Sequence, residues 1–487
     1  MKGLIAILST LTREEKQEFL LYLKRKNRRT DVKNEKLFKL IDAGKTEGLD
    51  ITLYGKPARN SFHALCKRLQ DTLIDFVASK SFAGETSEEL EILKLLLASR
   101  IFFEKKQYNV AIKTLEKAEK MALPLELYSI LNEIYHTKIQ YAHLSAKWVL
   151  REVIAASELN MELYQQDFRL NRAYAVIKSR LRESANASVQ EIVQNTFSEF
   201  RIELNEALTY KSLFQLMELM ATAAKLQSDF YSISPFVLEL YTIVKKKSGM
   251  KNKHRYYHLN ILNLLAVAQF RNKRFEASMK FTTQLELEMG RVNTYDYKRF
   301  SEKLATLKAL NYNYTGKPTE ALQILNGFKG HSLDIMLLTA MCLFQQNRFS
   351  EAYQIIKDLN HTDVFYEKKM GWIWVVKKNL IDILLLTELD KLDLVLLRLS
   401  RFKRKFSKLL RARGEERVLT FVNLISKYYE YPKQVETQEF KNEVENSFEW
   451  IGPDQEDIFV MSFYAWLKAK MEGENLYGIT LKLVGHI

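Results

Sequence analysis

Glycine and proline are both scarce in this chain. Its 487 residues include only 16 Gly and 6 Pro, against an average usage of about 7% and 5%. Because these two residues form most tight turns and interrupt helices, their scarcity argues against a fold of many short strands joined by turns. Apolar residues recur with helical rather than alternating spacing. The sequence therefore predicts an all-α protein.

Cysteine is scarcer still, since Cys66 and Cys342 are the only two. Each lies in an apolar stretch, and two such thiols provide neither a disulfide framework nor a cysteine zinc site. The most membrane-like stretch, 372–386, is interrupted by Lys-Lys-Asn at 377–379 and falls short of the ~20 residues that a membrane span needs. The apolar run at 1–8 is too short for a secretory signal. We expect a cytoplasmic protein, in a reducing compartment, with no membrane span.

Motifs of catalysis and cofactor binding are also missing. The chain has neither the glycine spacing of a P-loop nor that of a dinucleotide fingerprint, and it has no G-x-S-x-G elbow. His254 and His258 have the spacing used by some zinc enzymes, but Arg255 replaces the glutamate that follows the first histidine there. No third ligand is evident. We therefore expect no catalytic residue, no metal and no cofactor, and we expect that the protein is not an enzyme.

What the sequence does contain is a recurring pair of small residues, twelve positions apart. Two copies lie close together between 303 and 360, and each is followed by bulky apolar residues one helical turn later. Small residues at such positions let two antiparallel helices approach closely, while bulky neighbours fill the seam. The four pairs are Ser99/Ala111, Ala266/Ser278, Ala309/Ala321 and Ala340/Ala352. They predict four helical hairpins, each with its two small residues facing one another.

These four hairpins resemble tetratricopeptide repeats. The similar segments are about 95–124, 262–289, 305–330 and 336–361, roughly a quarter of the chain, against a family unit of ~34 residues. The third small residue of the family is Ala118 in the first unit but Leu285, Phe328 and Leu359 in the others. The resemblance implies a right-handed α-solenoid of antiparallel helix hairpins.

We expect three regions in the chain. Residues 1–85 form a small, basic N-terminal helical module that acts as a cap or a docking module, with an extended piece at 51–54 and with Leu65, Leu69 and Leu73 buried. Residues 88–365 form the repeats, which are degenerate in 125–260, where one helix spans 127–148. Residues 366–487 add further helices and a terminal capping helix, and the tail after Gly473 is extended or disordered.

In tetratricopeptide proteins, ligands usually lie in a concave groove lined by the first helix of each hairpin. The resemblance implies that a groove here binds a peptide or helix of another protein. No hairpin has the Lys and Asn pair that chaperone-binding members use to hold a terminal carboxylate, so an apolar groove is favoured. The predicted groove residues are Arg100, Phe103, Asn263, Phe270, Thr306, Asn313, Met341 and Phe344.

Positive charge is the strongest remaining signal, since the net charge is +15. Basic residues cluster at 24–29, 245–255 and 398–413. Such clusters either form solvated helix faces or contact anionic partners such as nucleic acid or an acidic protein. A helix-turn-helix in the N-terminal module is disfavoured, because a long loop separates Gly44 from Asn60. The alternative function is thus a nucleic-acid-associated regulator, with possible contacts at Arg25, Arg28, Arg29, Lys67, Arg68, Arg401, Arg404, Lys408 and Arg411.

Overall fold

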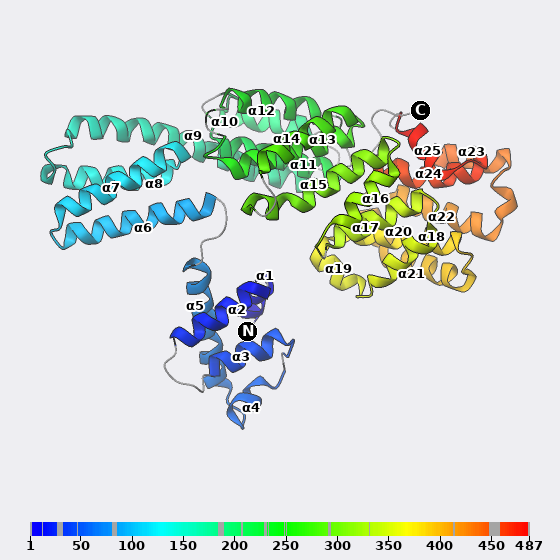
Figure 1. The fold of residues 1–487 in the computed structure, drawn as a ribbon, viewed down its shortest axis with the longest axis horizontal. Coiled ribbons are helices and arrows are strands. Elements are labelled where there is room, and N and C mark those ends of the chain that lie inside the picture. The colour runs from blue at the N-terminus through cyan, green and yellow to red at the C-terminus, as the bar shows by residue number, and fades with distance from the viewer. Residues whose placement is uncertain are drawn as a thin grey trace. The chain divides into compact units, whose positions relative to one another are not determined.

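The structure is a computed structural model of the 487-residue chain. It describes residues 2–11, 13–26, 33–45, 47–79, 85–183, 189–205, 208–227, 231, 233–247, 249, 251–290, 294–330, 332–412, 414–447 and 458–485. Those residues contain 25 α-helices and no strand, which confirms the predicted all-α class (Figure 1). The chain divides into two compact units, 1–122 and 123–487. The predicted region boundaries near 85 and 365 stay predictions.

The first unit begins with five helices that share one core. The Phe19 and Phe76 rings lie 5.1 Å apart between centroids, and the predicted burial of Leu65, Leu69 and Leu73 is confirmed. Every buried residue of this core comes from the first five helices. The helices of this unit are α1 (Lys2–Thr10), α2 (Arg13–Lys26), α3 (Lys33–Asp42), α4 (Leu49–Tyr54), α5 (Arg59–Ser79), α6 (Glu85–Glu104) and α7 (Tyr108–Ala122).

The second unit consists of helices that pack mainly against their neighbours in the chain. The first helices of successive hairpins, α13, α15, α17 and α20, also contact one another in that order. Its helices are α8 (Tyr128–Tyr141), α9 (Leu150–Glu183), α10 (Val189–Phe200), α11 (Tyr210–Gln227), α12 (Ser234–Lys246), α13 (Arg255–Arg271), α14 (Phe275–Met289), α15 (Tyr295–Tyr314), α16 (Pro318–Gly327), α17 (Leu333–Gln345), α18 (Phe349–Asp358), α19 (Asp363–Met370), α20 (Trp372–Glu388), α21 (Leu392–Ala412), α22 (Glu416–Glu430), α23 (Gln438–Ser447), α24 (Ile458–Glu472) and α25 (Leu476–Leu483).

The four predicted small-residue pairs lie on four consecutive-helix pairs that contact one another: α6 with α7, α13 with α14, α15 with α16, and α17 with α18. All eight side chains are completely buried. In the second pair the contact is direct, because the Ser278 hydroxyl donates a hydrogen bond to the Ala266 carbonyl at 2.9 Å. The predicted pairing of these helices is confirmed, and the direct contact between small residues is shown for Ala266 and Ser278.

Each hairpin turns through one residue with a left-handed backbone. In the α13/α14 turn, Lys273 has φ of 58°; its N–H bonds to the Phe270 carbonyl, and the next N–H bonds to Gln269, each at 2.9 Å. This double bond pattern is a Schellman motif, which satisfies carbonyls left over at the end of the first helix. The equivalent turn residues are Lys106, Gly316 and Asn347.

A fifth hairpin with the same turn escaped sequence reasoning. Asp390 has φ of 50° between α20 and α21, and it stands where Lys273 stands in the α13/α14 turn. The two small-residue positions are filled by Ile383 and Val395, both buried. Because bulky residues replace the small ones, the spacing pattern that revealed the other hairpins is absent here.

Two predicted non-helical segments are helices. Residues 51–54, expected to be extended, belong to α4, which begins after Gly48 and ends at Gly55, both with left-handed backbone. The tail after Gly473 contains α25, whose first turn is capped by the Asn475 side chain accepting from the N–H groups of Tyr477 and Gly478. In both cases a glycine or asparagine at the end of the segment favours a helix boundary there. This preference prevailed over the β-branched residues inside the segment, which are typical of strands.

The region 125–260 also departs from expectation. The helix predicted across 127–148 ends at Tyr141, and a short 3-10 turn follows at Ala142–Leu144. The next helix, α9, has 34 residues and packs against α8, α10 and α11 rather than forming a hairpin of repeat length. Among the described residues, no helix is both long and apolar enough to cross a membrane.

Candidate functional site

The predicted groove residues fall into two groups. Phe103, Phe270, Asn313 and Phe344 are buried, and the last three lie in the interior of the second unit. Phe270 packs edge-on against the Tyr314 ring at 5.6 Å between centroids. In this conformation these four side chains offer no surface to a partner. The other four, Arg100, Asn263, Thr306 and Met341, are half-buried, and their contact with a partner stays a prediction.

The C-terminal helices bond to α15 at Asn313 and Tyr314. Tyr477 of α25 donates a hydrogen bond to the Asn313 carbonyl at 2.6 Å, and the Tyr314 hydroxyl lies 2.5 Å from that of Ser462 on α24. Helix α25 also contacts α17. The chain therefore covers the ends of α15 and α17 with its own helices, at the place where the resemblance implied a groove for a partner.

An open groove lies next to these covered helices. It runs along α14 and is completed by the end of α15 and by Val484 and Gly485 after α25; its volume is about 990 Å³. We call it the α14 groove. Leu287, on its α14 wall, is 77% exposed, the most exposed of the large apolar side chains that the structure describes. Its other apolar lining residues are Phe275, Ala277, Met279 and Tyr312.

Cations outnumber anions in the α14 groove. Lys273, Arg274, Lys280 and Lys317 line it, and Glu276 is its one carboxylate among the described residues. The Lys317 ammonium lies 5.9 Å from the centre of the Tyr312 ring. An apolar wall with a cationic border suits a segment that carries a bulky apolar side chain between acidic ones.

The predicted nucleic-acid contacts are spread over both units. Arg28 and Arg29 lie outside the described residues, as does the side chain of Arg25. Lys67 and Arg68 are exposed on α5 in the first unit. The long loop expected between Gly44 and Asn60 contains α4, so α3 and α5 are not joined by a tight turn.

The four remaining predicted contacts lie together on α21. Arg401, Arg404, Lys408 and Arg411 are all exposed, whereas Phe402, on the opposite side of the helix, is 2% exposed. Cationic and apolar side chains thus lie on separate faces of α21. None of these four cations forms an ion pair with a residue that the structure describes.

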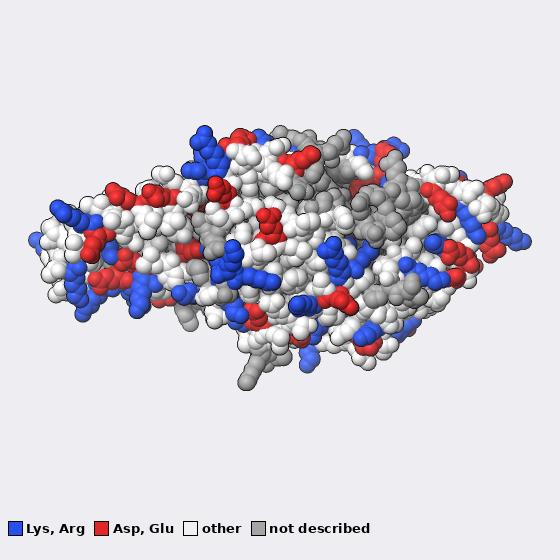
Figure 2. All heavy atoms as spheres, turned by 90° about the horizontal axis from the view of Figure 1, so that it is seen from above, with Lys and Arg blue, Asp and Glu red and all other residues white. Residues whose placement is uncertain are grey.

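The basic cluster at 245–255 is different, because several of its cations are bound within the chain. Lys247 is 10% exposed and its ammonium lies 2.8 Å from the Glu126 carboxylate. Arg255 is paired with Asp296. On the face of the molecule drawn in Figure 2, cations and anions are interspersed among the described residues. Among the described residues drawn there, the positive charge forms no continuous stripe of the kind that favours a nucleic-acid surface.

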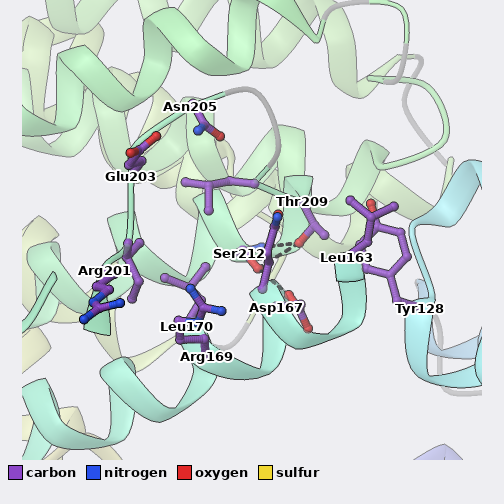
Figure 3. A pocket seen from close by; sticks show the side chains of 13 residues that line it. Tyr128, Leu163, Asp167, Arg169, Leu170, Arg201, Glu203, Asn205, Thr209 and Ser212 are labelled. Carbon is purple, nitrogen blue, oxygen red and sulfur yellow. Dashed lines mark hydrogen bonds between the residues drawn. The ribbon is translucent and has the colours of Figure 1, made fainter. Parts of the chain in front are cut away.

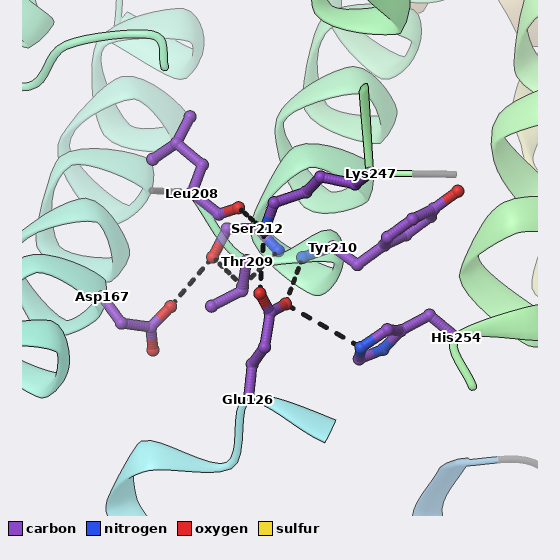
Figure 4. A network of polar contacts seen from close by, with 8 residues as sticks. All are labelled: Glu126, Asp167, Leu208, Thr209, Tyr210, Ser212, Lys247 and His254. Atoms are coloured by element: carbon purple, nitrogen blue, oxygen red, sulfur yellow. Dashed lines mark hydrogen bonds and ion pairs between the residues drawn. The ribbon is translucent and has the colours of Figure 1, made fainter. Parts of the chain in front are cut away.

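Glu126 is the centre of a buried polar junction (Figure 4). It has a left-handed backbone with φ of 54°, and its carboxylate accepts from Lys247 and, at 2.9 Å, from the Tyr210 N–H. His254 lies 3.8 Å from the same carboxylate. Lys247 donates a second bond to the Leu208 carbonyl at 2.7 Å. This Glu126 junction ties the start of the second unit to α11 and to the α12–α13 segment.

His258 extends the junction toward α14. Its Nδ1 lies 2.7 Å from the Tyr210 hydroxyl, and its Nε2 lies 2.8 Å from the Glu288 carboxylate. Burial lowers the pKa of His258, against the opposing effect of Glu288. Burial also raises the pKa of Tyr210. Both groups therefore stay neutral near pH 7, and Tyr210, His258 and Glu288 form a chain of polar contacts that joins α11, α13 and α14.

A pocket of about 220 Å³ lies beside the junction (Figure 3). Two carboxylates line it, Asp167 and Glu203, and Asp167 accepts from the Ser212 hydroxyl at 2.9 Å and from the Asn171 amide at 3.2 Å. Burial, with Glu126 and Asp167 nearby, raises the pKa of Tyr128 to about 12. Asp167 and Ser212 are therefore bonded within the chain, and the Tyr128 hydroxyl stays protonated near pH 7.

Within the described ranges, no group of three or more His, Cys, Asp or Glu side chains is arranged to hold a metal ion. Both cysteines are buried, and burial raises the pKa of Cys342 to about 12. A thiol held neutral in this way is unreactive.

Sequence reasoning missed Leu287 and Glu126. Leu287 falls in a helical apolar pattern that gives no sign of its exposure. Glu126 has no local signal, because its partner Lys247 is 121 positions away.

In comparisons with known proteins, no family model, no curated protein and no solved structure matches this chain. The fold therefore defines only a class, an all-helical protein with antiparallel helical hairpins.

Proposed function

We propose that this protein is a noncatalytic, cytoplasmic scaffold that binds a segment of another protein in the α14 groove. In this proposal the hairpins form a right-handed, tetratricopeptide-like α-solenoid. The observation that carries it is the groove itself: Leu287 is 77% exposed there, and four Lys and Arg residues line the same groove. A contiguous apolar patch on a surface often marks a binding site for a partner, and Met279 and Tyr312 line the same groove as Leu287.

The location of the groove supports a protein segment as the ligand. It follows the length of α14 and ends at Val484 and Gly485, so a peptide or helix lying along α14 would contact three separate parts of the chain. The Lys and Arg residues around it favour acidic flanking residues in the partner. The predicted groove over α15 and α17 is not needed for this binding, since α24 and α25 cover it.

The experiment is affinity capture from nuclease-treated lysate of the source cells, with partners quantified by mass spectrometry. Wild type is compared with Leu287→Asp and with Leu159→Asp, a matched change at an exposed leucine of α9. We expect a set of proteins captured by wild type and by Leu159→Asp but lost with Leu287→Asp. The same set captured with all three chains would overturn the assignment to this groove, and the absence of any enriched protein would overturn the scaffold function.

A further inference from the structure

The outer face of α21 carries an unusually regular row of exposed side chains. Successive members are separated by three, four, three, four and three positions. The row begins with two leucines that are 41% and 42% exposed and continues with four exposed cations. Its members are Leu394, Leu397, Arg401, Arg404, Lys408 and Arg411, which we call the α21 row.

The cations of the row differ from the other cations of α21 in their pairing. Arg398 lies 3.0 Å from the Asp382 carboxylate, Lys403 donates to the Ser426 hydroxyl at 3.1 Å, and Lys405 lies 2.9 Å from Asp363. No described carboxylate stands opposite the row itself. The other three cations of α21 therefore have polar partners within the chain, whereas the four cations of the row have no ion-pair partner among the described residues.

The spacing of the row is that of the a and d positions in a heptad repeat, which is the pattern that packs along a second helix. From Leu394 to Arg411 the row spans about 26 Å at 1.5 Å per residue. We propose that the α21 row binds an amphipathic helix of another protein that presents acidic residues opposite the four cations and apolar residues opposite the two leucines.

Charge and shape favour this occupant over nucleic acid. Carboxylates at heptad spacing would meet all four cations along one straight line, and each would form a charge-assisted hydrogen bond. Leu394 and Leu397 offer nothing to a phosphate backbone, whereas they would bury apolar area against a partner helix. The inference rests on the proposed scaffold function in that the ligand is again a protein, but it concerns a surface separate from the α14 groove.

The probe is a fluorescein-labelled helical peptide of about 21 residues, three heptads, with four glutamates and two leucines placed to match the row. It is made in both orientations, and anisotropy with the full chain gives the Kd. In the charge-reversal variant, Arg401, Arg404, Lys408 and Arg411 become Glu. We expect binding to weaken about 10- to 100-fold, because four weak exposed pairs become repulsive. A peptide with lysines in place of the glutamates should bind this variant and not wild type.

Two further variants give the controls. The first changes Lys113, Lys120, Arg151 and Lys178, all exposed on other helices, to Glu; it alters the net charge equally and should leave the Kd unchanged. The second changes Leu394 and Leu397 to Ser and should weaken binding roughly tenfold through lost apolar burial. Circular dichroism checks that all variants fold, since buried Phe402 and Phe406 are untouched.

Three outcomes would overturn the inference. One is equal loss in the charge-matched control, which would mean that binding depends only on net charge. Another is submicromolar binding of a mixed-sequence DNA or RNA oligonucleotide that is lost on charge reversal, with no peptide binding. The last is no binding of any probe. If the inference fails while Leu287→Asp still abolishes partner capture, the proposed scaffold function survives; if capture also fails, both are wrong.

Discussion

Among single residues, the turn positions carry the clearest local strain. The α15/α16 turn has Gly316 with φ of 77°, whereas the α13/α14 turn has Lys273 with φ of 58°. A side chain in this left-handed region clashes with the backbone, while glycine does not. The same turn geometry therefore has a higher conformational free energy with Lys273 than with Gly316.

We expect opposite effects from exchanging these residues. Gly316→Ala should lower the free energy of unfolding by ~1–2 kcal/mol, and Lys273→Gly should raise it by up to about 1 kcal/mol. Urea unfolding followed by circular dichroism measures both changes. Gly327→Ala, at the last residue of α16 with open space around its Cβ position, is the control and should stabilise slightly. A neutral Gly316→Ala would show that the turn tolerates side chains freely.

A second residue-scale prediction concerns pH and His258. Burial lowers the pKa of His258 below its ordinary value of 6.5, in spite of Glu288 and with help from Lys251 and Arg255. The unfolded chain then binds a proton more readily than the folded chain, so stability is complete above about pH 6.5 and is lost as the pH falls below it. Relative to His258→Gln, wild type should lose up to about 1.4 kcal/mol per pH unit there.

The measurement is chemical unfolding between pH 7.5 and about pH 5, with His63→Gln as the control at an exposed histidine. His63→Gln should keep the pH dependence of wild type. If His258→Gln keeps it as well, the buried imidazole does not drive the loss of stability.

At the scale of helices, the Glu126 junction joins distant segments through a buried ion pair. Glu126 and Lys247 are each 10% exposed and 2.8 Å apart, and they join the segment before α8 to the end of α12. A buried charge is tolerated only when its partner and hydrogen bonds are present. The junction is thus a fixed attachment between distant helices.

Breaking this pair should be costly. Lys247→Met leaves the Glu126 carboxylate buried without its cation and should destabilise the chain by ~3–5 kcal/mol, whereas the double change with Glu126→Gln should recover much of that loss. Thermal and urea unfolding of the two single variants and the double variant test this. Additive effects would mean that the two side chains do not interact as the structure places them.

On the scale of the whole molecule, the first five helices have a core of their own. Every buried member of that core, from Leu4 to Phe76, lies within α1–α5. Stability that comes from a self-contained core does not depend on the rest of the chain. The N-terminal module therefore has what it needs to fold independently.

We expect a fragment of residues 1–84 to be helical and to unfold cooperatively by itself, and a chain that begins at residue 85 to keep the melting temperature of the remaining helices. Calorimetry of the two fragments and the full chain is the test. A fragment that remains unfolded alone, or a large drop in melting temperature for the shortened chain, would show that the module needs the helices that follow it.

The sequence by itself determined the features that depend on neighbouring residues. Low glycine and proline content and helical periodicity predicted an all-α chain, and the pairs such as Ala309/Ala321 predicted the hairpins. These signals are local: propensity and the close approach of two helices joined by a short turn act over about twelve positions. They failed where the pattern changed, as in the hairpin with Ile383 and Val395.

Only the tertiary structure decided which surfaces remain open. Asn313 and Phe344 match the groove positions of the family, yet α24 and α25 return from far along the chain to cover that region. The sequence suggests a surface cation at Lys247, but the structure buries it beside Glu126. The sequence suggests a core residue at Leu287, but the structure exposes it to solvent. Burial depends on contacts between segments separated by a hundred residues or more, and no local pattern encodes such contacts.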